Sequence, residues 1–252
     1  MKISQRVQNL KLSPIRKLAP YADAAKKAGK KVYHLNIGQP DIETPPQFMD
    51  AIKNFDEKVI AYGASKGEPF LIEAIQKYYA EKGMNYEAGD IFITNGGSEA
   101  LTFAVMALCD PDDEIMVFEP FYANYTTFAS EFGAKINAVT TSVENGYHLP
   151  DAAEIEKHIT PKTKAILLTN PGNPTGVVYT EAEMQTIAAL AVKHDLAVIA
   201  DEVYREFIYT GSPYISACHL EGVEQNVVLI DSVSKRYSEC GIRIGALITK
   251  NK

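Results

Sequence analysis

The sequence predicts an α/β protein, a three-layer αβα sandwich around a mostly parallel sheet. Short apolar runs alternate along the chain with amphipathic helical patterns, which is typical of α/β folds. The runs are also mostly uninterrupted, as expected for strands that are covered on both faces. We therefore expect strands at residues 91–94, 114–119, 134–139, 164–169, 196–201, 227–231 and 242–248.

Helical patterns fill the intervals between these strands. We expect helices at about residues 14–29, 46–54, 68–82, 97–108, 122–132, 151–158 and 181–194. The last of these has a clear start, because Thr180 can cap it and Glu183 can return the bond in a capping box. In the helix at 68–82, the apolar stripe expected to face the core consists of Phe70, Leu71, Ala74, Ile75, Tyr78 and Tyr79.

The composition argues against several classes of partner. The 252 residues carry a net charge of −7 without a block of like charges, whereas nucleic acids and anionic membranes demand a basic face. No apolar run approaches the roughly 20 residues of a membrane span, and the N-terminus lacks the apolar region of a signal peptide. The three cysteines are widely spaced and no Cys/His cluster has metal-ligand spacing. We expect reduced thiols, no metal, and a soluble, cytoplasmic protein.

The first motif that carries chemistry is TNGGSEAL, residues 94–101, where a strand ends and a helix begins. Its glycines allow close approach of a ligand to the backbone, and the first N–H groups of a helix have no partner within the helix. Together with the helix dipole they form an anion site. Taken alone, a plain strand-to-helix connection explains the motif better. The Glu99 carboxylate would repel a phosphate unless its side chain points away.

The second motif is NPGNPTG, residues 170–176, directly after an expected strand. Two Asn-Pro steps and two glycines predict a rigid loop at the carboxyl end of that strand, where ligands of open α/β sheets collect. The alternative is a structural turn, but a turn requires neither two prolines nor the second asparagine. We therefore favour a functional role for this loop.

The third motif is the pair Asp201-Glu202 at the end of the strand AVIAD. Successive strand side chains face opposite ways, so only one of the two carboxylates can point at a given ligand. Such a carboxylate raises the pKa of a protonated ring nitrogen beside it. Taken alone, a helix cap or a surface charge is an equally good interpretation. Tyr204 lies close enough in sequence to reach the same pocket.

The fourth motif is DSVSKRYSECGIRIG, residues 231–245. Lys235 follows two serines, and Arg243 lies in an apolar pattern, where a buried arginine would need a partner. An amine that is partly neutral can act as a nucleophile, and hydroxyls with a guanidinium suit a phosphate dianion. A lone lysine is more often a solvated surface charge.

In this order the four motifs resemble those of the class I and II aminotransferases, which are pyridoxal-phosphate (PLP) enzymes of fold type I. The similarity extends from about residue 35 to the C-terminus, and the eight-residue spacing from Lys235 to Arg243 fits the family pattern. The resemblance implies the large PLP-binding domain of fold type I. It also implies an enzyme that transfers an amino group from an L-amino acid to a 2-oxo acid.

The resemblance further implies roles for single residues. Lys235 would hold PLP in a Schiff base and, once displaced by substrate, would move the proton between Cα and C4′. Asp201 would be the partner of the pyridine nitrogen, Tyr204 and Asn173 would donate to the ring oxygen, and Tyr122 would stack on the ring. The phosphate would be held by Gly97, Ser98, Glu99, Ser232 and Arg243.

Two further residues extend the resemblance beyond the cofactor. Gly38 would close over the substrate carboxylate, which Asn173 would also contact. Tyr62 would reach the phosphate of the neighbouring subunit in a homodimer. Residues 1–45 would be an N-terminal segment that packs with a small domain, and residues 46–252 the PLP-binding domain. The chain stops before the C-terminal small domain and its carboxylate-binding arginine, so we expect a fragment or a truncated product, with doubtful turnover alone.

Other interpretations stay open. A carbon–sulfur lyase, a decarboxylase or a cyclase of fold type I would keep the same cofactor residues. A non-catalytic module that binds PLP is a second alternative. A nucleotide-binding α/β protein is a third, but it would need G-x-G-x-x-G after its first strand or a Walker lysine, and TNGGSEAL has neither.

Overall fold

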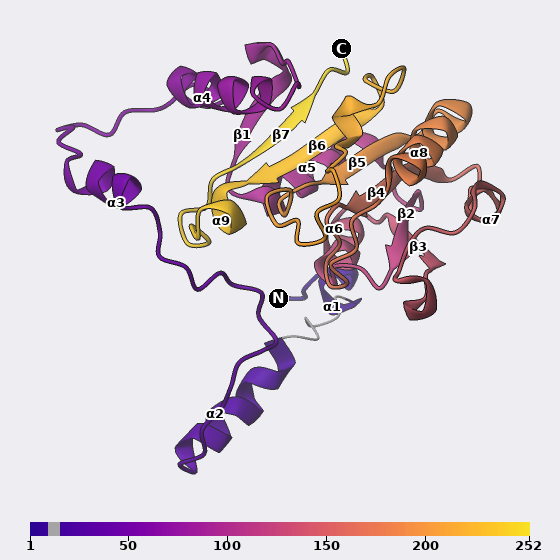
Figure 1. Cartoon of the computed structure of the whole chain (residues 1–252). Helices are drawn as coiled ribbons and strands as arrows, with labels where there is room; N and C mark the ends of the chain where they lie inside the picture. The colour runs from indigo at the N-terminus through magenta and orange to yellow at the C-terminus, as the bar shows by residue number, and fades with distance from the viewer. Residues whose placement is uncertain (10–15) are drawn as a thin grey trace.

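The computed structural model describes residues 1–9 and 16–252, and its centre is a seven-stranded sheet (Figure 1). The strand order is β1-β7-β6-β5-β4-β2-β3. Only β7 runs antiparallel to its neighbours, so the expected mostly parallel sheet is confirmed. The strands are β1 (Ile91–Thr94), β2 (Glu114–Glu119), β3 (Lys135–Thr140), β4 (Thr163–Thr169), β5 (Ala197–Asp201), β6 (Val227–Ser232) and β7 (Gly245–Thr249).

Helices cover both faces of the sheet and complete the three layers. On one face α5 (Gly97–Leu108) and α6 (Asn124–Glu131) share a core with Val117, Ile199 and Ile230 of the strands. On the other, α4 (Pro69–Ala80), α7 (Ala152–Lys157) and α8 (Glu181–His194) share a core with Met116 and Leu229. Neighbouring strand residues thus enter opposite cores, which explains why the strands read as continuous apolar runs.

The helices with strong start signals begin where the sequence predicts. The N–H of Glu183 donates to Thr180 Oγ1 at 3.3 Å and the N–H of Thr180 donates to Glu183 Oε2 at 2.7 Å, which is the expected capping box of α8. Helix α5 begins directly after Gly96, whose φ of 77° belongs to the left-handed region that glycine tolerates.

Several expected boundaries are wrong. The strand expected at 242–248 begins only at Gly245, because Arg243 adopts a left-handed φ of 63° that a regular strand cannot contain. Of the helix expected at 14–29, residues 14 and 15 lie outside the described residues, and the rest is a 3₁₀ turn followed by α2 (Ala19–Lys27). In α4 the buried residues are Ile72 and Tyr79, whereas Phe70 is exposed.

Some short elements were not predicted from the sequence. They are α1 (Gln5–Asn9), α9 (Val233–Arg236) and the 3₁₀ turns Arg16–Leu18, Ala88–Asp90, Val143–Asn145 and Ala217–His219. Helix α9 begins where Ser232 Oγ accepts the N–H of Ser234 at 3.1 Å. It is a single turn after β6, too short to leave a hydrophobic period in the sequence.

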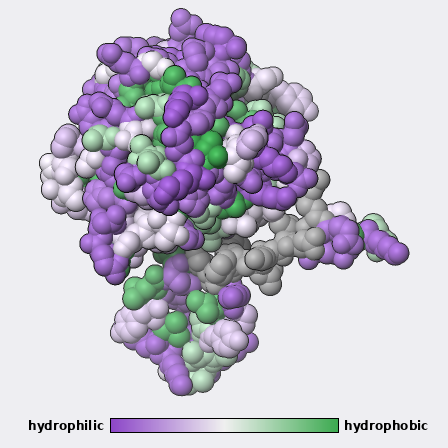
Figure 2. Space-filling view, turned by 90° about the vertical axis from the view of Figure 1, so that its right-hand side faces the viewer, coloured by the Kyte–Doolittle hydropathy of each residue, from purple (hydrophilic) through white to green (hydrophobic). Residues whose placement is uncertain are grey.

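The N-terminal part of the chain contributes no core. Among residues 1–71, none whose burial the structure describes is buried, and Ile72 is the first that is. Helices α2 and α3 (Pro46–Lys53) lie apart from the sheet in Figure 1, and α2 projects below the main body again in Figure 2. Across residues 1–9 and 16–252, no helix is both long enough and apolar enough to span a membrane.

Candidate functional site

The four motifs meet at one edge of the sheet. Strands β4, β5 and β6 are parallel, so Asn173, Asp201 and Lys235 all follow carboxyl ends at this edge. Strand β1 also ends there, because β7 pairs antiparallel with both β1 and β6. The start of β7, preceded by Arg243, lies opposite the end of β1. The order of the strands therefore brings together four motifs that are dispersed over residues 94–245 of the sequence.

Asp201 is a buried acid on the face covered by α5 and α6. Its Oδ2 accepts the hydroxyl of Tyr125 at 2.7 Å, and its Oδ1 accepts the N–H of Val203 at 3.4 Å. Burial raises the pKa of Asp201 to about 6, although the bond from Tyr125 lowers it. A cationic partner would stabilise the ionised form of this buried carboxyl group.

Glu202, the next residue, faces the other way. Its Oε1 accepts the Ser216 hydroxyl at 2.8 Å and the N–H of Ala217 at 3.0 Å, and its Oε2 lies 3.2 Å from Arg205 Nη2. The two carboxylates thus face opposite sides of the sheet, as expected, and Asp201 is the one that faces Tyr125.

Tyr204 and Asn173 face each other across the same edge. Asn173 Nδ2 donates to the Tyr204 hydroxyl at 3.3 Å. Burial, together with the nearby Asp201, Tyr122 and Cys240, raises the pKa of Tyr204 to about 12, although the bond from Asn173 lowers it. These groups are therefore within electrostatic range of one hydroxyl, which stays protonated and can donate to an anionic oxygen.

The two asparagines of NPGNPTG have different tasks. Asn170 is fully buried, and its Nδ2 donates to the carbonyl oxygen of Ile215 at 3.2 Å while its Oδ1 accepts the N–H of Tyr179 at 3.1 Å. Its own N–H donates to the carbonyl oxygen of Asp201 at 3.1 Å. Asn170 therefore holds the loop to its surroundings, and Asn173 is the asparagine that reaches the site.

The turn between β1 and α5 forms a cradle beside Arg243. A Cβ on Gly96 would lie 2.3 Å from Arg243 Nη2, and the left-handed φ of 77° favours glycine at this position. A Cβ on Gly97 would lie 3.7 Å from the Cβ of Ser232, which places the serine against the helix start. The N–H groups of Gly97 and Ser98 have no partner within the described chain. The two N–H groups and the guanidinium thus lie at one helix N-terminus, with Ser232 beside them, whose hydroxyl donates to Ser234 Oγ at 2.8 Å.

Glu99 does not oppose an anion here. Its Oε2 accepts the N–H of Asn95 at 2.7 Å, so the carboxylate is turned back toward the preceding strand. Its own N–H donates to the carbonyl oxygen of Gly96 at 3.2 Å and is already engaged. Arg243 is exposed rather than buried in a strand, and its Nη1 donates to the carbonyl oxygen of Cys240 at 2.9 Å.

Lys235 projects from α9 toward the N-terminal segment. Its Nζ donates to the carbonyl oxygen of Gly38 at 2.7 Å and lies 3.9 Å from Cys240 Sγ. Six residues after Gly38, Thr44 donates to the carbonyl oxygen of Ser238 at 3.0 Å. The LNIGQPD segment therefore passes over the turn that carries the lysine, and the Gly38 carbonyl oxygen contacts the lysine amine.

One predicted residue lies away from the site, and one residue at the site was not predicted. Tyr62 is fully exposed and lies outside this group of side chains. Tyr125 was missed, although it is buried, bonds Asp201 and also contacts Thr169 Oγ1 at 2.5 Å. Its only signal is its place three residues after Tyr122 in a helical pattern, whose rings meet edge to face at 5.4 Å.

Comparison with known proteins decides what this arrangement belongs to. A family described as aminotransferase class I and II matches residues 30–252. The chain belongs to this family. The expected family and the fold of its PLP-dependent members are thereby confirmed.

Curated members of the aminotransferase family match almost the whole chain. The aspartate aminotransferase of Thermotoga maritima is 33% identical over 252 residues, which is 99% of this chain and 66% of that protein. The aspartate aminotransferase of Geobacillus stearothermophilus is 31% identical over 97% of this chain and 63% of its own length. The chain thus spans less than two thirds of the length of these relatives.

Solved structures agree with these relatives. The crystal structure of the Thermotoga maritima aspartate aminotransferase superposes with a TM-score of 0.92 at 33% identity and covers 99% of this chain and 66% of its own. Alanine aminotransferase from Pyrococcus furiosus gives 0.89 at 33% identity, over 98% of this chain and 63% of its own.

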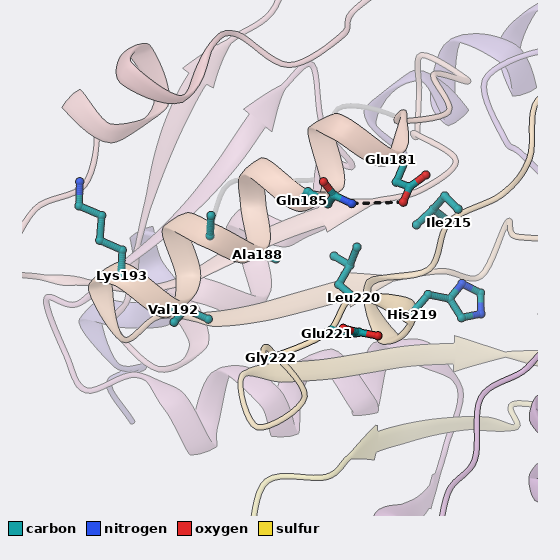
Figure 3. A pocket seen from close by; sticks show the side chains of 11 residues that line it. Glu181, Gln185, Ala188, Val192, Lys193, Ile215, His219, Leu220, Glu221 and Gly222 are labelled. Carbon is teal, nitrogen blue, oxygen red and sulfur yellow. Dashed lines mark hydrogen bonds between the residues drawn. The ribbon is translucent and has the colours of Figure 1, made fainter.

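A hollow elsewhere on this aminotransferase-family chain has a different lining. It lies between α8 and residues 215–222, and Figure 3 shows Glu181, Gln185 and Val192 on one side with His219 and Leu220 on the other. None of the site residues lines it. Within residues 1–9 and 16–252, no group of three or more His, Cys, Asp or Glu side chains could hold a metal ion.

Proposed function

We propose that this chain forms the PLP site of an aminotransferase that moves an amino group from an L-amino acid to a 2-oxo acid. The observation that carries the proposal is that a lysine amine, a buried acid and a cradle of unpaired N–H groups beside an arginine lie at one sheet edge. The amine is that of Lys235, the acid is Asp201, and the cradle follows β1 at Gly96.

The residues present fit the cofactor group by group. The Lys235 amine would hold its aldehyde, and Asp201, whose buried carboxyl group lacks a cation, would pair with the ring nitrogen. Tyr204 and Asn173 would donate to the ring oxygen, and Tyr122 would lie against the ring. The phosphate would bind to the N–H groups and side chains of Gly97, Ser98, Ser232 and Arg243. Glu99 would contribute little, because its N–H is engaged.

Each chain residue has a defined task in the reaction. PLP, when bound, supplies an electron sink for the electron pair left on the substrate Cα when its proton departs. Lys235 Nζ would take that proton from Cα as a general base and deliver it to C4′ as a general acid. Asp201 would keep a proton on the ring nitrogen, because an ionised carboxylate at this buried site stabilises the adjacent cation. Tyr204 and Asn173 would orient the ring.

The substrate side of the site involves the N-terminal segment and a second subunit. Gly38 already reaches Lys235, and we propose that its segment covers the substrate carboxylate together with Asn173. Tyr62, fully exposed, would reach the phosphate in the partner subunit of a homodimer. Residues 1–45, among which none whose burial the structure describes is buried, would pack against parts beyond the PLP-binding domain at 46–252. Aspartate and alanine are the amino acids to test first, because the relatives are named for them.

The experiment is a spectral titration of the 252-residue protein with PLP. Wild type should develop the visible absorbance of lysine-bound cofactor, and borohydride should fix the cofactor to Lys235, as peptide mass spectrometry would show. Lys235→Ala should lack the band, whereas Lys193→Ala, which removes an exposed lysine paired with Glu156, should keep it. A folded wild type without the band would contradict the proposal. Transfer itself is checked by mixing loaded protein with an amino acid and a 2-oxo acid; release of ammonia or carbon dioxide instead would reject transamination.

A further inference from the structure

Lys235 and its neighbour Arg236 point to different sides of one short turn. Both belong to α9, which is four residues long. A helix of this length is not stable by itself, so its orientation depends on the contacts of its side chains. Successive residues of a helix point about 100° apart. Whatever holds Arg236 therefore also sets the direction of Lys235.

Arg236 is held on two sides. Its Nη2 lies 2.7 Å and 3.0 Å from the two carboxylate oxygens of Asp231, and both side chains are about nine-tenths buried. The guanidinium carbon lies 4.1 Å from the ring centroid of Tyr78. A guanidinium with a carboxylate at its edge and an aromatic ring against its face has little rotational freedom. Its position is therefore well determined.

The partner carboxylate is itself fixed. Tyr79 donates its hydroxyl to Asp231 Oδ2 at 2.7 Å, and the N–H of Ser232 donates to Oδ1 at 2.8 Å. Burial alone would raise the pKa of Asp231, but Arg205, Arg236 and the bond from Tyr79 hold it below its ordinary value. Asp231 is thus a fixed, ionised anchor on the strand that leads into α9.

The ring beneath Arg236 is also fixed. The Tyr78 hydroxyl donates to Glu206 Oε1, and Lys82 Nζ lies 2.8 Å from the same oxygen and 4.8 Å from the Tyr78 ring centroid. We call Asp231, Arg236, Tyr78 and Tyr79 the anchor cluster. It joins the end of α4 to the lysine-bearing turn across more than 150 residues of sequence.

Lys235 has no comparable support. Its amine contacts the Gly38 carbonyl oxygen and Cys240 Sγ, and the described part of the chain contains no ion pair of this side chain. The Gly38 carbonyl oxygen belongs to a segment without buried residues. The direction of the Lys235 side chain is therefore determined by the contacts of Arg236, on the opposite side of the turn.

We propose that Arg236 is a positioning residue for Lys235: its ion pair with Asp231 and its stacking on Tyr78 fix the rotation of the α9 turn so that the lysine amine points into the cofactor site. This inference rests on the proposed function, because the direction of Lys235 matters only if its amine binds the cofactor. It assigns no contact with substrate or cofactor to Arg236.

A merely structural ion pair makes a different prediction. Removing Arg236 alone leaves Asp231 buried without its closest cation and destabilises the fold, whereas removing both charges relieves that cost. In the double variant Asp231→Asn/Arg236→Met, a structural role predicts recovery of stability and of cofactor binding together. A positioning role predicts recovery of stability only, since neither remaining side chain can hold the turn.

The experiment measures two quantities on the full chain with PLP. The first is the rate at which the visible band of lysine-bound cofactor appears, and the second is the pH midpoint of that band. We expect Arg236→Met and the double variant to be roughly tenfold to a hundredfold slower than wild type, in keeping with the cost of misplacing a reacting group. Ile187→Ala, in the buried face of α8, is the control for lost stability and should react at the wild-type rate.

The outcomes separate the inference from the function on which it rests. If wild type shows no band that depends on Lys235, the proposed function fails. If wild type forms the band but the stable double variant matches its rate and pH midpoint, Arg236 is structural only and the inference is overturned. Should Arg236→Met not fold, Arg236→Lys, which keeps the charge but loses the two-oxygen contact and the stacking, carries the test with the same expected slowing. A wild-type rate for that variant would reject the inference as well.

Discussion

The edge of the sheet that carries the site and the N-terminal part of the chain are built differently. At the sheet edge, functional side chains follow strands whose interior residues, such as Leu229 and Ile230, are fully buried. Before Ile72, apolar side chains such as Leu35 and Ile60 are 95% and 85% exposed. Burial of apolar surface therefore orders the residues at the strand ends within this chain, whereas among residues 1–71 none whose burial the structure describes is buried.

The largest expected effect tests this contrast directly. Ile230→Ala should lower the free energy of unfolding by about 2–5 kcal/mol, because Ile230 lies in the core and directly beneath Gly97. Ile60→Ala should change it by less than about 0.5 kcal/mol. Urea denaturation measures both, and equal losses would show that the N-terminal segment shares the core after all.

The buried Asp201 makes the free energy of unfolding depend on pH. The pKa of Asp201 in the folded protein, about 6, lies above the ordinary 3.8, so the protonated carboxyl group favours the folded state. This contribution to stability is present below about pH 4 and is lost as the pH rises through 6. Asp201→Asn lacks this loss. Relative to wild type, the cofactor-free variant should therefore gain about 3 kcal/mol between pH 4 and 7.5.

Urea denaturation at the two pH values gives the difference for Asp201. Added PLP should shrink the gain of Asp201→Asn, because a cationic ring nitrogen favours the ionised carboxylate. A difference that is independent of pH would show that Asp201 is not held in a raised-pKa environment.

The two loop asparagines provide a smaller effect with a matched pair. Asn170→Ala should cost about 1–3 kcal/mol, since it leaves the buried N–H of Tyr179 and the carbonyl oxygen of Ile215 without a partner. Asn173→Ala should leave stability nearly unchanged but weaken PLP binding. Denaturation and spectral titration separate the two, and the reverse pattern would exchange the roles assigned to them.

Tyr62→Ala should have the smallest effect on the isolated subunit. The side chain is fully exposed, so its removal should not measurably change stability at low protein concentration. If Tyr62 reaches the partner subunit's cofactor, PLP affinity should fall only under conditions in which dimers form. Sedimentation combined with PLP titration tests this, and unchanged affinity in a proven dimer would remove Tyr62 from the site.

Much of the fold could be predicted because local signals agree with the packing. The capping box at Thr180 fixes the start of α8, and the uninterrupted apolar runs mark the central strands. The residues at the strand ends could also be proposed, since parallel strands bring them to one edge. Strand-to-strand order itself has no local signal, and it is this order that brings Arg243 beside Gly96.

Other features could not be predicted because they depend on neighbours remote in sequence. Tyr79 looks like one more apolar residue in a helix, but its hydroxyl bonds Asp231, 152 residues away. Arg243 looks like part of a strand until its left-handed backbone is known. Tyr125 resembles a core aromatic and becomes a partner of Asp201 only in the folded chain.

The alternation at the ends of β5 and β6 places a constraint on strand length. Asp201 and Ser232 lie on the face covered by α5 and α6, while their neighbours Glu202 and Asp231 bond the opposite layer. Deleting one residue within β5 before Asp201 would put Glu202 where the ring nitrogen is expected, and deleting one within β6 before Asp231 would turn Asp231 to the face of α5 and α6. Deleting even a small residue such as Ala200 would thus change which carboxylate faces the pocket, although every functional residue would still be present.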